Sequence, residues 1–142
     1  MATAPIDIDA EEYRPTDQEP FMNDRQLAYF RAKLATWKED LLRGARDTLG
    51  TMRQDNMRES DLADRAASVT EWSVELRARD RQRKLISKID SAIRRIDEGE
   101  YGYCEVTGDE IALARLEARP IATMTVDAQE SHERRERAFR EG

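Results

Sequence analysis

Two acidic residues stand close together near the middle of the chain, where they could influence a metal ion. Asp61 and Asp64 lie in the stretch DLADRAA, and Ala66 follows two residues later. Acids at the start of a helix cap free amide groups and complement the positive end of the dipole, so one interpretation is structural. The other is that the paired carboxylates are carried into another molecule and act on its bound Mg²⁺, which takes oxygen ligands. The spacing allows both interpretations.

A basic stretch follows, in which arginine and lysine side chains outnumber the acids. It contains Arg77, Arg79, Arg81, Arg83, Lys84 and Lys88. One interpretation is a solvated face of a coiled coil. The other is a patch that binds phosphate or carboxylate groups, both of which pair well with guanidinium. Arg115 and Arg119 would join this patch if the C-terminal part folds back onto it.

Other residues that carry chemistry are scarce. The chain has one cysteine, Cys104, and one histidine, His132, which stand far apart in the sequence. A single cysteine forms no internal disulfide and does not by itself hold a structural metal. The sequence contains no nucleophile elbow, phosphate-binding glycine loop or pair of metal-binding histidines. We therefore expect a protein that is not an enzyme.

Length and composition favour a small helical protein. The 142 residues are 38% charged and 6% aromatic, which suits a helical assembly better than a large round core. The apolar stretches are far shorter than the ~20 residues that cross a bilayer, and no apolar segment of a signal peptide follows Met1. We expect a cytoplasmic protein without membrane association.

The net charge of −6 comes entirely from the start of the chain. Residues 1–24 contain seven acids and one base, and the remainder is neutral. Three prolines and few apolar side chains predict a flexible acidic tail over residues 1–22. A body without a basic surplus argues against binding to bare DNA and favours a protein partner.

Hydrophobic periodicity predicts two long helices. The first begins at an N-cap, Asn23 or Asp24, and the second ends near Glu98. Apolar residues of the first recur every three or four positions, at Leu27, Phe30, Leu34, Trp37, Leu41, Ala45, Thr48 and Met52. The second has an early seam at Val69, Trp72 and Leu76 and a later seam at Leu85, Ile89, Ala92 and Ile96.

The two helices should pair as an antiparallel hairpin. The polar stretch 53–64 predicts a turn, and the charged stretch 77–84 predicts a shift of register between the two seams. We expect residues 23–98 to form a coiled-coil hairpin whose tip lies near residues 56–66. Gly99 and Gly102 then end the second helix. Residues 99–142 predict a small irregular unit with short strands, followed by a charged terminal helix, so the fold class is mainly α.

Several segments together resemble the DksA/TraR family of RNA polymerase-binding transcription factors. They are NDRQLAYFRAKLATWKEDL, DLADRAA, ELRARDRQRKLISKID, EGEYGYCEVTGDEI and RLEARP, between about residues 22 and 130. The resemblance implies a monomeric protein that inserts its coiled coil into the secondary channel of RNA polymerase and binds no promoter DNA itself. With guanosine tetraphosphate, it would alter the stability of open complexes, repressing ribosomal RNA promoters and activating some biosynthetic ones.

The resemblance also implies roles for individual residues. The family's tip acids and alanine fall on Asp61, Asp64 and Ala66, and its channel-rim contact falls on Arg81. The alarmone contacts map to Leu85, Lys88 and Arg119. A basic residue of the family's last helix is replaced here by Gln129.

The four zinc-binding cysteines of the family match Cys104, Thr107, Thr125 and Ala128. Since hydroxyl and methyl groups do not replace thiolates as zinc ligands, we expect a chain that binds no zinc and holds no other cofactor stably. The small unit would then close through its apolar residues Ile111, Leu113, Leu116, Ile121 and Met124.

Two alternatives to an initiation regulator stay open. A transcript-cleavage factor of the Gre kind would also offer an acidic coiled-coil tip to the metal of the polymerase. A coiled-coil adaptor without a role at the polymerase is the second alternative.

Overall fold

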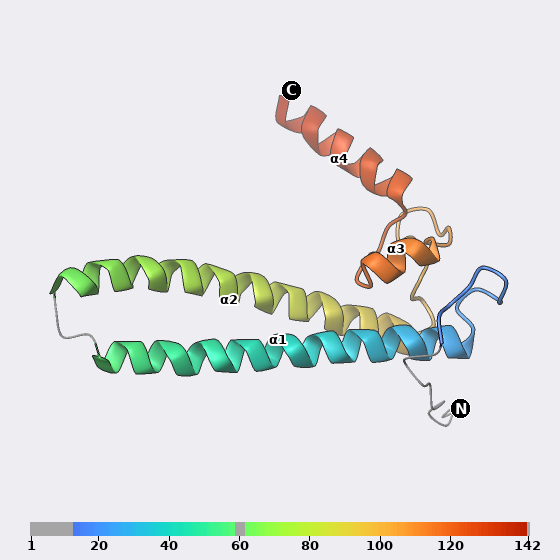
Figure 1. Cartoon of the computed structure of the whole chain (residues 1–142). Helices are drawn as coiled ribbons and strands as arrows, with labels where there is room; N and C mark the ends of the chain where they lie inside the picture. The colour runs from blue at the N-terminus through green and yellow to red at the C-terminus, as the bar shows by residue number, and fades with distance from the viewer. Residues whose placement is uncertain (1–12, 59–61, 142) are drawn as a thin grey trace. The chain divides into compact units, whose positions relative to one another are not determined.

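The computed structural model describes residues 13–58 and 62–141, and for residues 48–58 and 62–68 it describes the backbone alone. The described chain forms four helices, α1 (Asp24–Arg58), α2 (Leu62–Asp97), α3 (Leu113–Ala118) and α4 (Val126–Glu141), shown in Figure 1. The predicted mainly α class is confirmed. Instead of the expected short strands, the described C-terminal part has a single isolated bridge, between Tyr103 and Glu110.

The chain divides into two compact units, and α1 and α2 run through both. The base unit contains the residues up to Leu34 and those from Ser91 onward, and the hairpin unit is Ala35–Asp90. The domain boundaries expected after residues 22 and 98 stay predictions. Within the described residues, none of the helices combines the length and the apolar character needed to cross a membrane.

The hairpin unit consists of the distal parts of α1 and α2, which lie side by side and run antiparallel (Figure 1). An ion pair joins them, with Lys38 Nζ lying 2.7 Å from Asp90 Oδ1. Helix α1 extends to Arg58 and helix α2 begins at Leu62, so most of the polar stretch 53–64 is helical. The predicted turn was too long because the arginine, glutamine and methionine residues there are good helix formers.

Helix α1 begins as the sequence predicted. The backbone N–H of Gln26 donates to Asn23 Oδ1 at 2.9 Å, which makes Asn23 the N-cap. Phe30 and Leu34 are fully buried. The other described residues of the predicted apolar face are half-buried, so this face of the first helix is confirmed over its described side chains: Leu27, Trp37, Leu41 and Ala45.

Helix α2 departs from the predicted seam. Its later seam is confirmed, and the same heptad spacing continues backward through three half-buried residues, Gln82, Ala78 and Glu75. The register shift expected in the charged stretch 77–84 therefore does not occur. As a consequence, the early seam is wrong: Val69, Trp72 and Leu76 are 69%, 39% and 48% exposed.

The core of the base unit gathers side chains from both long helices and from the C-terminal part. Phe30 of α1 packs against Tyr101, with ring centroids 5.6 Å apart. The Tyr101 hydroxyl donates to the carbonyl oxygen of Pro120 at 2.7 Å, and burial raises the pKa of this tyrosine. Ile111, Leu113 and Leu116, three of the expected apolar residues, are buried here.

The segment before α1 is held by a buried polar side chain. Gln26 is fully buried; its Oε1 accepts from the Met22 N–H at 2.8 Å, and its Nε2 donates to the Thr16 carbonyl at 3.2 Å. Tyr13 is also buried and donates to Glu19 Oε2 at 2.5 Å. Residues 13–22 thus make defined contacts within the base unit, while residues 1–12, the rest of the predicted tail, lie outside the described residues.

Glycines close the end of α2. Gly99 has a φ of +77° and Gly102 a φ of +93°, values that side chains disfavour. A Cβ on Gly102 would lie 2.9 Å from Met22 Cγ. The chain can therefore turn sharply here and approach the segment before α1.

Candidate functional site

The predicted acidic tip lies only partly within the described residues. Asp61 is outside them. Asp64 and Ala66 fall in the first turns of α2, where the structure describes the backbone and not the side chains. A position at the start of a helix suits a carboxylate because of the helix dipole. Any role of these three residues at a polymerase stays a prediction.

The basic residues of α2 form an exposed surface of the hairpin unit. Five of them are exposed: Arg77, Arg81, Arg83, Lys84 and Lys88. Among the described side chains, none of the ion pairs includes any of these five. The sixth, Arg79, is half-buried. These guanidinium and ammonium groups are thus available to a partner that carries phosphates or carboxylates.

The residues assigned to the alarmone lie on different elements. Leu85 is half-buried and Lys88 is exposed, both on α2 in the hairpin unit. Arg119 follows α3 in the base unit, and its side chain is exposed. On α4, Gln129 Nε2 donates to Glu133 Oε1 at 3.1 Å. The grouping of these residues around a nucleotide stays a prediction.

The four positions that match the zinc-binding cysteines come together around Cys104. The Cys104 side chain is buried and receives hydrogen bonds from the Thr107 hydroxyl and from the backbone N–H of Thr125. The Thr125 hydroxyl oxygen in turn accepts from the backbone N–H of Ala128 at 3.2 Å. Cys104, Thr107, Thr125 and Ala128 therefore lie close together in the base unit.

The thiol of Cys104 is polarised by this cluster. Burial raises its pKa, but hydrogen bonds from the Thr107 side chain and from backbone N–H groups of Val106, Thr107 and Thr125 outweigh burial and lower the pKa to about 6. A thiolate stabilised by donors is more reactive than an ordinary buried thiol, although its 3% exposure limits access.

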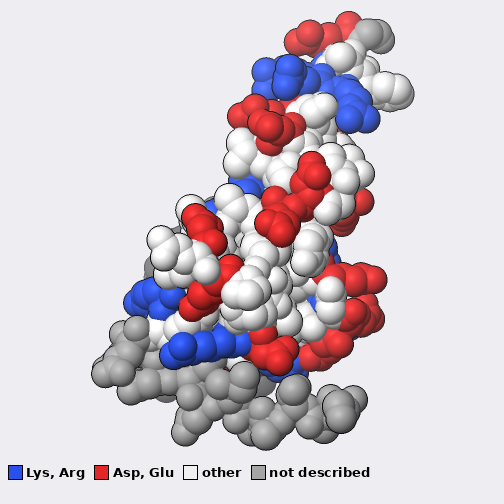
Figure 2. Space-filling view, turned by 90° about the vertical axis from the view of Figure 1, so that its right-hand side faces the viewer, with Lys and Arg blue, Asp and Glu red and all other residues white. Residues whose placement is uncertain are grey.

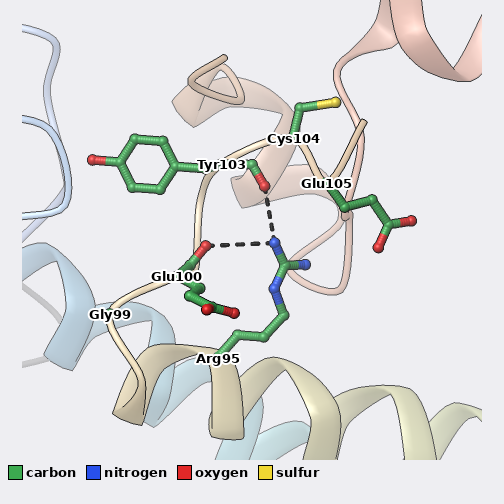
Figure 3. Close-up of a pocket in the computed structure, with 6 residues that line it drawn as sticks. All are labelled: Arg95, Gly99, Glu100, Tyr103, Cys104 and Glu105. Carbon is green, nitrogen blue, oxygen red and sulfur yellow. Dashed lines mark hydrogen bonds between the residues drawn. The ribbon is translucent and has the colours of Figure 1, made fainter. Parts of the chain in front are cut away.

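An open pocket of about 600 Å³ lies beside Cys104, lined by Arg95, Gly99, Glu100, Tyr103, Cys104 and Glu105. Figure 3 shows the Arg95 guanidinium reaching across it while the sulfur of Cys104 points away. Arg95 Nη2 donates to the carbonyl of Tyr103 at 2.9 Å and to that of Glu100 at 3.4 Å. Arg95 was not among the predicted site residues, because hydrogen bonds from a side chain to distant carbonyls leave no periodic signal in the sequence.

Two long antiparallel helices and a base unit with a cysteine-containing turn define a class of coiled-coil proteins with a small C-terminal unit. Residues 26–96 match the family model for the DnaK suppressor protein DksA, N-terminal domain, and residues 99–134 match that of the prokaryotic dksA/traR C4-type zinc finger. The chain belongs to the DksA/TraR family.

Similar proteins cover nearly the whole chain. The RNA polymerase-binding transcription factor DksA of Caulobacter vibrioides is 59% identical over 141 residues, which are 99% of each chain. The protein of the same name from Escherichia coli K12 is 41% identical over 127 residues, 89% of this chain and 84% of its own. Both relatives are named as transcription factors and not as enzymes.

A solved structure supports the fold. The transcription factor DksA2 from Pseudomonas aeruginosa superposes with a TM-score of 0.78 at 38% sequence identity, covering 84% of this chain and 94% of the other. The combination of a coiled-coil hairpin and a C-terminal helix is therefore shared with a family member.

The family match corrects the cofactor prediction. We expected a chain that binds no zinc, but residues 99–134 match a C4-type zinc finger, so that prediction is contradicted. The cluster itself offers one thiol, two hydroxyls and a methyl group, which do not fit a tetrahedral zinc site. The described residues also contain no group of three or more His, Cys, Asp and Glu side chains that could hold a metal.

Proposed function

We propose that the chain regulates transcription initiation by inserting its hairpin into the secondary channel of RNA polymerase. The observation that carries this proposal is the hairpin: α1 and α2 contain 35 and 36 residues, each ~50 Å long at 1.5 Å per residue. A helical hairpin of this length can extend from the surface of the polymerase to its buried active centre. The names of its relatives, RNA polymerase-binding transcription factors, support the choice of partner.

In this proposal the tip acts beside the catalytic Mg²⁺ of the polymerase. Asp61, Asp64 and Ala66 are carried there at the turn between the helices, and the carboxylates influence the metal and the DNA strands near it. Arg81 contacts the rim of the channel. The protein itself catalyses no reaction; it changes the lifetime of the open complex.

Guanosine tetraphosphate is the proposed effector at the polymerase interface. Lys88 and Arg119 would pair with its phosphates, and Leu85 would pack against it. Because Gln129 carries no charge, this position of α4 would add no ion pair to the nucleotide. We expect the complex to repress ribosomal RNA promoters and to activate some biosynthetic promoters.

In the proposed function the protein does not bind DNA directly. On the face drawn in Figure 2, Lys and Arg side chains gather near the end of α4 and acidic side chains border them. Such a mixed surface attracts a phosphate backbone weakly, because opposite charges cancel much of the field. We propose that the protein acts as a monomer in the cytoplasm, where its polymerase partner works.

The test is the lifetime of open complexes at a ribosomal RNA promoter, measured with purified polymerase and with or without guanosine tetraphosphate. Wild-type protein should shorten the lifetime, and Asp64→Asn should abolish the effect while leaving polymerase binding largely intact. Asp40→Asn is the matched control, since it removes the same charge from an exposed position of α1. Equal activity of all three proteins would refute the role of the tip.

The same protein distinguishes the Gre-like alternative. A backtracked elongation complex is incubated with it, and the RNA is resolved by length. Intact RNA supports the initiation regulator, whereas shortened RNA would show that the tip promotes hydrolysis by the polymerase. Failure to bind purified polymerase would leave the adaptor alternative.

A further inference from the structure

The backbone on both sides of Arg119 is held by side chains from other parts of the base unit. Arg119 is the C-cap of α3. Before it, the carbonyl oxygen of Glu117 accepts from Lys33 Nζ of α1 at 2.8 Å. After it, the carbonyl oxygen of Pro120 accepts from the buried Tyr101 hydroxyl at 2.7 Å. The arginine side chain therefore starts from a backbone that is fixed at two nearby carbonyl groups.

Lys33 completes the C-terminus of α3. The last carbonyl groups of a helix have no partner within it, and α3 has only six residues. Lys33 Nζ bonds to the Glu117 carbonyl and also lies 2.7 Å from Glu117 Oε2, so one ammonium group holds both the backbone and the side chain of the same residue. A cation at this end of a helix is also favoured by the dipole. We call these bonds between Lys33 and Glu117 the α3 clamp.

Neighbouring side chains support the α3 clamp. The Tyr29 hydroxyl donates to the Glu117 carboxylate, and Arg14 Nη1 donates to the Tyr29 hydroxyl oxygen at 3.3 Å. Tyr29 is buried, and the side chains of Lys33 and Glu117 are 35% and 32% exposed. A partly buried carboxylate that accepts from two donors has little freedom to turn. The clamp therefore fixes the end of α3 against α1.

The side chain of Arg119 differs from the backbone that carries it. It is exposed and takes part in none of the ion pairs among the described side chains. An exposed arginine needs no anchored backbone in order to be stable in water. A fixed backbone does help when the guanidinium binds a ligand, because less conformational entropy is then lost on binding.

We propose that the α3 clamp positions Arg119 for the phosphates of guanosine tetraphosphate. Lys33 and Glu117 are then positioning residues, which act on the nucleotide through Arg119, and neither is among the predicted nucleotide contacts. This inference rests on the proposed function and deepens it, since that function assigns Arg119 to the nucleotide.

The test is a titration of guanosine tetraphosphate against polymerase and the whole chain, followed by the lifetime of open complexes at a ribosomal RNA promoter. Lys33→Met removes both bonds of the clamp and should raise the half-maximal nucleotide concentration about fivefold, while saturating nucleotide restores the full effect. Lys33→Arg retains a cation that can donate to both oxygens and should stay close to wild type. Arg31→Met is the matched control, since it removes a cation of α1 that pairs with Asp97 and not with α3.

Glu117→Gln distinguishes positioning from a simple effect of charge. Glu117 stands two residues before Arg119, so loss of its negative charge alone would strengthen the binding of an anion. The proposal predicts the opposite: the half-maximal nucleotide concentration should rise, by about threefold. This is less than for Lys33→Met, because the amide oxygen of glutamine still accepts from Lys33. A fall in this concentration for Glu117→Gln would overturn the proposal.

A measurement on the free protein tests the clamp without polymerase. The heteronuclear ¹⁵N NOE of the Arg119 amide reports backbone motion on the picosecond to nanosecond timescale. It should fall in Lys33→Met and stay at the wild-type value in Arg31→Met, while the amide of the buried Leu116 keeps its value in both. An unchanged NOE of Arg119 in Lys33→Met, or an equal fall at Leu116, would overturn the proposal.

The outcomes separate this inference from the function on which it rests. If wild-type protein shows no response to guanosine tetraphosphate, the effector part of the proposed function fails and the inference fails with it. If wild type responds and Lys33→Met responds at the same nucleotide concentration, only the positioning role is wrong. A smaller maximal effect of Lys33→Met with an unchanged half-maximal concentration would indicate a loss of folded protein, and would also overturn the inference.

Discussion

The two units of this molecule use apolar side chains in opposite ways. Among the described residues, fourteen hydrophobic side chains are buried, and thirteen of them belong to the base unit; Ile89 is the exception. Of the eight large hydrophobic side chains that are exposed, five belong to the hairpin unit: Leu42, Val69, Trp72, Val74 and Leu76. The base unit thus buries its apolar residues in its own core, and the hairpin unit displays them.

This difference indicates that the two units have different roles. A unit with its own core and buried polar bonds, such as those of Gln26, holds its shape without a partner. A helix pair whose half-buried positions include Gln82 and Glu75 gains less from folding alone and leaves apolar side chains exposed.

The largest effect is expected in the core of the base unit. Leu116 is fully buried, so Leu116→Ala should lower the free energy of unfolding by about 3 kcal/mol through lost burial and a residual cavity. The same change at Leu76, which is 48% exposed, should cost less than about 1 kcal/mol. Urea titrations followed by circular dichroism measure both. Equal losses would mean that Leu76 is as well packed as Leu116, and the contrast between the units would disappear.

Glycine substitutions should act with opposite signs in the two units. Gly102→Ala places a Cβ at a φ of +93° and 2.9 Å from Met22 Cγ, and should destabilise the protein by about 1–2 kcal/mol. Gly44→Ala lies inside α1 in the hairpin unit with no atom within 4 Å of the new Cβ. It should stabilise the protein by about 0.5–1 kcal/mol because alanine favours the helix. Thermal unfolding measures both predictions: Tm should fall for Gly102→Ala and rise for Gly44→Ala. A rise in Tm for Gly102→Ala would contradict the predicted strain at this position.

The sequence predicted the helices better than their faces. The N-cap at Asn23 and the apolar face through Phe30 and Leu34 followed from local signals, and both are found. Periodicity equally marked Trp72 and Leu76, yet these face outward. A heptad pattern predicts that one face of a helix is apolar. It does not predict whether that face contacts the other helix or another molecule.

The polar interior of the base unit was beyond prediction for another reason. Gln26, Tyr101 and Arg95 are held by hydrogen bonds to carbonyl groups remote in the sequence or to loops without periodicity. Only the positions Cys104, Thr107, Thr125 and Ala128 could be grouped beforehand, because their spacing matches a family pattern. The same reasoning from ligand types led to the wrong conclusion on zinc, which the family match corrects.

An acidic side chain should make the base unit sensitive to low pH. Burial raises the pKa of Glu117, but the Lys33 ammonium, 2.7 Å away, and the Tyr29 hydroxyl together outweigh burial and keep the pKa below the usual 4.5. A lowered folded pKa means that the stabilisation is complete above the unfolded pKa and is lost as pH falls through the folded value. Glu117→Gln should therefore cost up to about 1 kcal/mol at pH 7 and flatten the loss of stability below pH ~4.5.

Unfolding titrations between pH 7 and pH ~3 measure this dependence. Glu130→Gln is the matched control, since Glu130 is an exposed carboxylate on α4. If the free energy of unfolding depends on pH in the same way for Glu117→Gln, Glu130→Gln and wild type, the ion pair of Lys33 and Glu117 does not stabilise the base unit.

The smallest effect is expected for the ion pair of the hairpin unit. Lys38 and Asp90 lie 2.7 Å apart, with side chains 35% and 43% exposed, so water screens much of their attraction. Asp90→Asn should lower the free energy of unfolding by no more than about 0.5 kcal/mol, and about 1 M NaCl should remove the difference. Urea titrations at low and high salt provide the measurement, with Asp80→Asn as the control for a change of charge alone. A salt-resistant loss above about 1.5 kcal/mol would mean that this pair is effectively buried. The hairpin unit would then be held as firmly as the base unit, and the exposure of Trp72 and Leu76 would not mark a weakly stabilised unit.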